Sequence, residues 1–177
     1  HLRERGVEVK VLNPKRGFPT PEEIEAVLTH RTRVVALDYV SFRNGCKIDI
    51  ATIQKQVQES KSLLVVDATQ AVGAIPLNVD SFLVDAFSCA AYKWLLGPYG
   101  TGFAFLRQNI QDRLTTTSVN WMSVEGADKF HELPGENFIP SKDARRFDVP
   151  ETANFLNLYA LESSLEYILR VGVKKIS

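Results

Sequence analysis

Residues 84–102 read VDAFSCAAYKWLLGPYGTG and join an apolar strand pattern to a glycine-rich turn. Residues 84–91 predict a buried β-strand, and residues 102–106 predict a further strand after the turn. A single lysine, Lys93, lies between the first strand and the turn. Lysine is almost never fully buried without a partner, so its position between two apolar segments requires a specific reason.

A second strand with a charged end lies upstream of this stretch. Residues 62–66 are apolar on both faces, which is typical of a central strand in a parallel sheet, and Asp67 follows them directly. Ligands of open α/β sheets bind beyond the carboxyl ends of the strands, so Asp67 and Lys93 are both placed for function. The alternative interpretation is that the two side chains pair with each other or that both reach solvent.

The remaining pattern predicts the fold class. Strand patterns occupy residues 7–11 and 33–40, and helical spacing follows the capping box that begins at Thr20. Further helices are predicted around residues 50–57 and 158–169. Strands that alternate with helices predict an α/β fold, with a mostly parallel sheet flanked by helices on both faces.

One internal segment and the two ends of the chain depart from the regular pattern. Residues 115–154 lose the periodic pattern, and a stretch of this length is usually functional or mobile. Helical patterns at residues 1–5 and around Ile176 have no start and no stop signal, respectively. We therefore expect a single domain core over residues 1–177 that is truncated at both ends.

The composition excludes several classes of function. Lys plus Arg and Asp plus Glu both number 21, so the net charge is zero and nothing indicates a nucleic-acid partner. Apolar runs are shorter than a bilayer span, and no zinc-ligand spacing occurs, so neither a membrane nor a metal is expected. Cys46 and Cys89 make no disulfide framework, which favours a reducing cytoplasm.

A lysine and a carboxylate at two strand ends suit one kind of cofactor chemistry. An enzyme that uses pyridoxal 5′-phosphate (PLP) as its cofactor needs a lysine amine to hold the cofactor aldehyde as a Schiff base. It also needs a carboxylate to keep the pyridine nitrogen protonated. The protonated ring then accepts electrons from a bond that breaks at the substrate α-carbon.

The residues around these two positions resemble a known family. Residues 84–93, followed by 97–102, resemble the cofactor-lysine signature of class V aminotransferases, and residues 67–73 resemble the family's Asp-x-x-Gln/His element. This family includes cysteine desulfurases and kynureninases. The resemblance implies the large domain of fold type I, with Lys93 as the Schiff-base lysine. It also implies Asp67 on the ring nitrogen and Gln70 on the phenolic oxygen of the cofactor.

The sequence departs from the desulfurase pattern near the lysine. Desulfurases usually carry His directly before it and Ser three residues before it, where this chain has Tyr92 and Ala90. Tyr92 is more similar to the kynureninase branch, which implies a contact between its phenol and the cofactor phosphate. The alternative is a core tyrosine bonded to the backbone. The loop of residues 41–45 either lines the substrate pocket or is a plain turn.

The resemblance also carries an expectation about assembly. Members of the family act as symmetric dimers, which implies a homodimer and places Thr152 near the partner's phosphate. Residues 115–154 contain scattered apolar side chains that need a packing surface. They either cover the partner's pocket or fold back on their own domain as a lid.

The leading functional hypothesis is transamination of a small amino-acid-like substrate. C–S or C–C lysis is the nearest alternative because its first steps are shared. A second alternative is a non-catalytic fragment of the fold. A third, an unrelated nucleotide binder, is disfavoured because no Gly-x-Gly-x-x-Gly or Walker pattern follows any strand.

Overall fold

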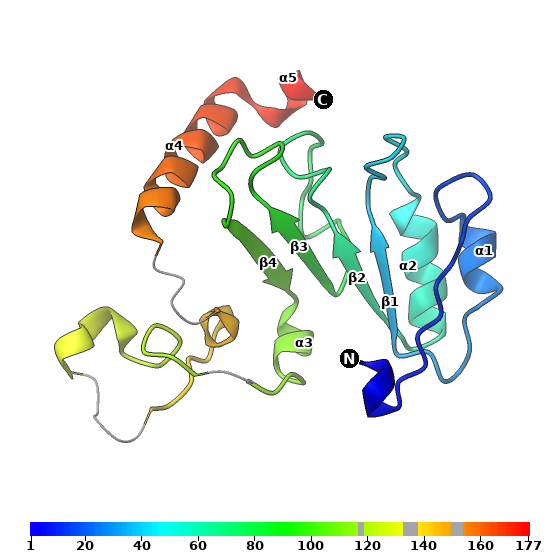
Figure 1. Ribbon diagram of the computed structural model, residues 1–177, viewed down its shortest axis with the longest axis horizontal. Helices are drawn as coiled ribbons and strands as arrows, with labels where there is room; N and C mark the ends of the chain where they lie inside the picture. Colours follow the sequence, from blue (N-terminus) through cyan, green and yellow to red (C-terminus); the bar gives the residue numbers. More distant parts are fainter. Residues whose placement is uncertain (117–118, 133–137, 150–153) are drawn as a thin grey trace.

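A four-stranded sheet organises the chain. The computed structural model describes residues 1–116, 119–132, 138–149 and 154–177. The strands lie in the order β1 (Val34–Asp38), β2 (Leu63–Asp67), β3 (Ala86–Ala90) and β4 (Gly102–Leu106). The first three strands are parallel, whereas β4 runs antiparallel to β3 (Figure 1). The mostly parallel sheet expected from the sequence is confirmed.

Helices and short 3₁₀ turns connect and follow the strands. In chain order they are η1 (Arg3–Arg5), α1 (Pro21–Glu25), α2 (Ile50–Glu59), α3 (Gln108–Gln111), η2 (Ala127–Glu132), η3 (Ala144–Phe147), α4 (Phe155–Val171) and α5 (Val173–Ile176). The predicted capping box begins α1. The Thr20 hydroxyl accepts from the amide of Glu23, and the Glu23 carboxylate accepts from the amide of Thr20. A cap of this kind contributes about 1 kcal/mol.

Two hydrophobic clusters join the helices to one face of the sheet. Ile53 and Val57 of α2 pack in the same cluster as Leu64 and Val66 of β2, and all four are almost fully buried. In the second cluster, Ile168 of α4 packs with residues of β3 and of the turn that follows it: Cys89, Ala91 and Leu95. Helices α2 and α4 therefore anchor the neighbouring strands β2 and β3, whose ends carry Asp67 and the segment leading to Lys93.

The opposite face is less covered than expected. Alternate residues of β2 point to opposite faces, and the side that carries Val65 and Asp67 is partly or fully exposed. Ser88 of β3 and Val34 of β1 are exposed on the same side. Within the described ranges, the expectation of helices on both faces is thus correct for one face only.

The strand predicted at residues 7–11 is wrong. The structure assigns no strand there, and Val7, Val9 and Val11 are 46%, 39% and 69% exposed. Alternating valines are compatible with a strand, but a strand also needs a neighbour that satisfies its backbone hydrogen bonds. These residues pair with no strand in the part of the chain that the structure describes.

Candidate active site

The carboxyl ends of three parallel strands form one edge of the sheet. In the register of the strands, Asp38 lies beside Asp67, and Asp67 lies beside Ser88. Strand β3 ends at Ala90, so Lys93 follows in the turn just beyond the same edge. The structure therefore brings Asp67 and Lys93 to one edge, as the parallel topology predicts.

Asp67 presents its carboxylate to solvent. The side chain is exposed, and its Oδ1 accepts a hydrogen bond of 2.8 Å from the backbone amide of Thr69. Lys93 is half-buried, and no ion pair joins it to Asp67 among the described residues. Of the two alternatives to a cofactor role, mutual pairing is wrong, while access of the carboxylate to solvent is observed.

The turn after Lys93 is held from two sides. The amide of Leu96 donates to the carbonyl of Lys93 at 3.0 Å, and the amide of Gly97 donates to the carbonyl of Ala91 at 2.8 Å. Leu96 adopts the left-handed conformation with φ of 55°, which costs a residue with a branched side chain some strain. The hydroxyl of Ser164 on α4 donates to the Leu96 carbonyl at 3.0 Å, so α4 braces this turn.

The loop after β2 packs directly on the turn after β3. Gly73 has φ of 91°, and a Cβ at this position would lie 2.7 Å from the carbonyl oxygen of Trp94. No residue with a side chain fits this approach without a shift of the backbone. The contact keeps the loop that carries Asp67 and Gln70 against the segment that carries Lys93.

Tyr92 belongs to an exposed aromatic pair. The residue is 40% exposed, and its ring stacks on Tyr99 with centroids 4.7 Å apart. The Nζ of Lys93 lies 5.7 Å from the centroid of the Tyr92 ring. Its hydroxyl makes no hydrogen bond with the residues that the structure describes. The alternative interpretation, a core tyrosine bonded to the backbone, is therefore wrong.

Two other predicted site positions have different outcomes. Gln70 is half-buried in the loop after β2, on the same edge as Asp67 and Lys93. Thr152 lies outside the described residues.

The loop at residues 41–45 follows β1 at this edge and closes as a turn, with the amide of Gly45 donating to the carbonyl of Ser41 at 2.9 Å. Phe42 in it is 68% exposed, so both interpretations of this loop stay open.

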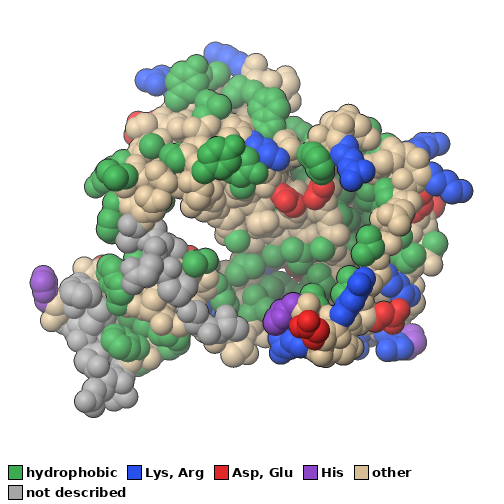
Figure 2. Space-filling view, in the orientation of Figure 1, with side chains coloured by type: hydrophobic (Ala, Val, Ile, Leu, Met, Phe, Trp, Pro, Cys, Tyr) green, Lys and Arg blue, Asp and Glu red, His purple; other side chains and the backbone are tan. Residues whose placement is uncertain are grey.

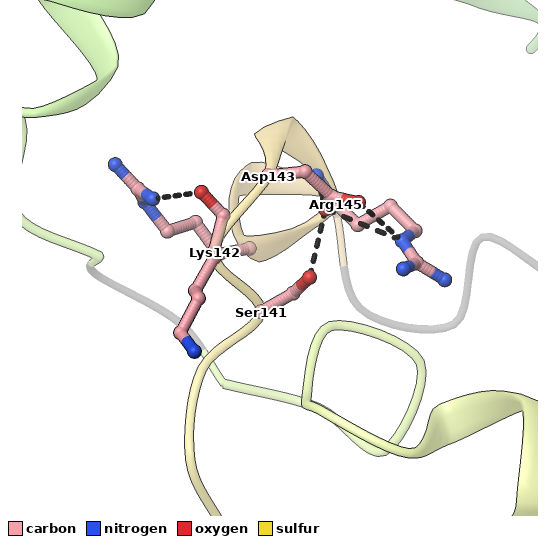
Figure 3. A network of polar contacts seen from close by, with 5 residues as sticks. Ser141, Lys142, Asp143 and Arg145 are labelled. Atoms are coloured by element: carbon pink, nitrogen blue, oxygen red, sulfur yellow. Dashed lines mark hydrogen bonds and ion pairs between the residues drawn. The ribbon is translucent and has the colours of Figure 1, made fainter.

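Residues 141–146 are held by a network of hydrogen bonds among themselves (Figure 3). The Ser141 hydroxyl and the Arg145 amide both donate to Asp143 Oδ1, at 2.8 and 3.0 Å. The hydrogen bond from Ser141, followed by those from Arg145, holds the pKa of the Asp143 carboxyl below its usual value. In Figure 1 the segment lies on the side of the sheet where β4 ends, away from the edge with Lys93. This part of the segment therefore does not form the lid over its own domain, which was the alternative interpretation of residues 115–154.

One functional candidate was not identified from the sequence. Thr69 is only 8% exposed, and its hydroxyl accepts a hydrogen bond of 3.0 Å from the amide of Ala90. A signal was present, because a hydroxyl residue two positions after an aspartate commonly bonds to local backbone groups. The long-range partner on β3 was not predictable from this local pattern.

The described residues fit PLP. The cofactor requires an amine for its aldehyde and a carboxylate for its ring nitrogen, and the edge offers both on adjacent segments. The exposed Asp67 carboxylate has one oxygen bonded to Thr69 and the other available. In the space-filling view, acidic and basic side chains lie close together above the ends of the strands, with hydrophobic side chains around them (Figure 2).

The buried Cys89 provides a prediction about pH. Burial, with a further contribution from the charge of Asp67, raises the pKa of the Cys89 thiol from 9.0 to about 11. At pH 8 about one part in a thousand of such a thiol is ionised. We expect iodoacetamide to alkylate Cys46, which is half-buried in a loop, and to leave Cys89 unmodified until the protein is denatured. Mass spectrometry showing equal rates at the two sites would contradict this picture.

The raised pKa of Cys89 also makes the stability of the folded protein depend on pH. The folded state binds the thiol proton more tightly than the unfolded state, so Cys89 favours folding at a pH below about 9. This contribution is lost as the pH rises through the folded value of about 11.

Comparison with known proteins identifies first the fold and then the family. The chain superposes on the apo structure of a cysteine desulfurase from Thermococcus onnurineus NA1 with a TM-score of 0.75 at 21% identity, covering 93% of this chain and 39% of that one. The fold is thus that of PLP-dependent enzymes of fold type I. The family model of aminotransferase class-V matches residues 1–177. The chain belongs to the class-V aminotransferase family, and its cofactor is PLP.

Two curated relatives match nearly the whole chain but are much longer than it. It is 27% identical to a probable cysteine desulfurase of Methanothermobacter thermautotrophicus over 99% of its length. It is 31% identical to the uncharacterized aminotransferase YcbU of Bacillus subtilis over 95% of its length. The chain spans 42% and 43% of these two relatives. No helix among its described residues is long and apolar enough to cross a membrane.

Proposed function

We propose that this chain is the cofactor-binding core of a PLP-dependent enzyme that transaminates an amino-acid-like substrate. The observation that carries the proposal is the register of β2 and β3, which puts Asp67 and Lys93 at one edge of the sheet. The domain core would span residues 1–177 of a longer protein. PLP, when bound, supplies an electron sink for a bond that breaks at the substrate α-carbon.

Each side chain has a separate task in this proposal. Lys93 binds the cofactor aldehyde through its amine and afterwards moves the α-proton of the substrate. The Asp67 carboxylate holds a proton on the ring nitrogen, because a carboxylate stabilises a neighbouring cation. Gln70 would donate to the phenolic oxygen, and the exposed Tyr92 hydroxyl would donate to the phosphate.

The position of Lys93 supports the assignment of these tasks. Its backbone carbonyl is bonded to Leu96, and the turn is braced by Ser164 of α4, so its Cα is well fixed. Its side chain is half-buried beside the Tyr92 ring. A fixed backbone position and a flexible four-carbon side chain suit an amine that must first bind the cofactor and then reach a substrate proton.

C–S or C–C lysis is the second candidate. One relative is described as a probable cysteine desulfurase, which favours a sulfur-containing amino acid as the substrate. Lysis uses the same lysine and the same carboxylate, because both reactions begin with loss of a bond at the α-carbon. The shared first step gives Lys93 and Asp67 the same tasks in both reactions, so these two residues do not distinguish them.

Single-turnover assays on the full-length PLP-loaded protein separate these candidates. We expect L-alanine to convert the visible absorbance of the bound cofactor to that of its amine form, with one equivalent of pyruvate released. Sulfide released from L-cysteine in the presence of dithiothreitol, without this conversion, would favour lysis. Failure of both reactions with PLP bound would support a non-catalytic role and contradict the proposal.

Homodimer formation is part of the proposal. Ile139 and Val149, in the segment that lies away from its own Lys93, are 61% and 70% exposed. Apolar side chains of this kind need a packing surface, and a twofold partner provides one. Thr152 would then approach the partner's phosphate.

The proposal also includes a cytoplasmic location. It rests on the sequence argument that Cys46 and Cys89, both free in the structure, form no disulfide framework.

A further inference from the structure

Thr69 connects the loop that carries Asp67 to the end of β3, which leads to Lys93. Its backbone amide donates to the Asp67 carboxylate at 2.8 Å, and its hydroxyl accepts from the amide of Ala90 at 3.0 Å. Ala90 is the last residue of β3 and lies just before the segment that carries Lys93. One nearly buried residue therefore contacts both the carboxylate and the strand end that leads to the lysine.

The hydrogen bond from the Ala90 amide to the Thr69 hydroxyl differs in kind from the other contacts between these two segments. It is the one side-chain hydrogen bond between the loop after β2 and the end of β3 in the described ranges. Further links between these segments are the backbone hydrogen bond from the Ala68 amide to the Ser88 carbonyl, the close approach of Gly73 to Trp94, and the packing of Val72 against the cluster that contains Cys89. Ala68 and Gly73 lie on either side of Thr69, and neither contact includes the Asp67 side chain, whereas the amide of Thr69 donates to the Asp67 carboxylate.

The energetics favour an ordered contact. A fully buried amide that loses its acceptor costs about 1–3 kcal/mol. The bond from the half-buried Ala90 to Thr69 is part-buried, so its loss should cost part of that amount, which favours keeping the Thr69 hydroxyl at Ala90. Because Thr69 also donates to Asp67, any shift of the loop moves the carboxylate relative to Lys93. A tight loop of this kind suits a site whose groups must be held within a fraction of an ångström.

We propose that Thr69 is a positioning residue that sets the Asp67 carboxylate relative to Lys93, an inference that rests on the proposed function of these two residues. It acts through its contacts with Asp67 and Ala90. The hydroxyl, not the methyl group of the side chain, carries this role, because the hydroxyl oxygen is the acceptor for Ala90.

Three variants of the full-length protein test this role. Thr69→Val keeps the shape and removes the acceptor, Thr69→Ser keeps the hydroxyl, and Ser62→Ala is the matched control. Ser62 is also nearly buried, and its hydroxyl bonds to the carbonyl of Thr32 at the opposite end of β2. Thermal unfolding measures the stability of each variant, and PLP titration measures affinity and the pH dependence of the bound cofactor's absorbance.

We expect Thr69→Val to weaken PLP binding about tenfold, which corresponds to about 1.4 kcal/mol, and to shift the pH at which the absorbance changes. Thr69→Ser should restore both properties. Ser62→Ala should lower the melting temperature without changing either. If Thr69→Val does not fold, Thr69→Ala takes its place in the comparison.

The outcomes separate this inference from the function on which it rests. Wild-type affinity and absorbance in Thr69→Val, or equal changes in Ser62→Ala, would show that Thr69 has only a structural role. Wild-type protein that binds no PLP at Lys93 would overturn the proposed function itself, and the positioning role with it.

Discussion

Replacement of Lys93 by alanine should abolish the visible absorbance of lysine-bound PLP and reduce turnover to the background rate. The physical reason is that an alanine has no amine to bind the aldehyde and no group to move the α-proton. Lys93 lies beyond β3 at the functional edge, and its turn is held by hydrogen bonds that do not involve its side chain. The fold should therefore persist, which circular dichroism and thermal unfolding will measure.

Lys55→Ala is the matched control for this variant. Lys55 is an exposed lysine in the middle of α2 and has no assigned task in the site, so its loss should leave the absorbance and the turnover unchanged. Retention of the visible band in Lys93→Ala, or its loss in Lys55→Ala, would refute the assignment of Lys93.

The second large effect is expected at Asp67. Asp67→Asn should keep PLP bound but slow the loss of the substrate α-proton by several orders of magnitude. An amide carries no negative charge, so it cannot hold the proton on the ring nitrogen that makes the ring an electron sink. Stopped-flow measurement of α-deuterium exchange in the PLP-loaded protein gives this step directly.

The neighbouring strand provides a control of the same chemistry. Asp38 is an exposed carboxylate at the end of β1 and lies beside Asp67 in the register of the sheet. Asp38→Asn removes an equal charge from the same edge and should change the exchange rate little. An equal loss in both variants would indicate a general effect of charge at this edge, and near-normal exchange in Asp67→Asn would contradict the proposed role.

The sequence predicted most of the sheet because its signals were both local and strong. The β-branched and apolar run at residues 62–66 was expected as a central strand, and β2 occupies that position between β1 and β3. The capping box at Thr20 also predicted the start of α1. These signals depend on neighbouring residues alone, so a pattern in one sequence contains the information they need.

Failures occurred where the structure depends on distant partners. Alternation at residues 7–11 predicted a strand, but a strand forms only where a neighbour completes its hydrogen bonds. The exposed face around Ser88 and the contact of Thr69 with Ala90 are likewise set by what packs there. Among the candidate site residues, Asp67 and Lys93 were predictable because the ends of parallel strands share an edge. Their supporting contacts required the three-dimensional arrangement.

The covalent attachment point of the cofactor decides whether Lys93 is the lysine that holds PLP. Borohydride reduction of the PLP-loaded full-length protein, followed by proteolysis and mass spectrometry, identifies the lysine that holds the cofactor. We predict that the phosphopyridoxyl group is found on the peptide that contains Lys93, at one equivalent per chain. A label on any other lysine, or no label after reduction of protein that retains PLP, would contradict the account.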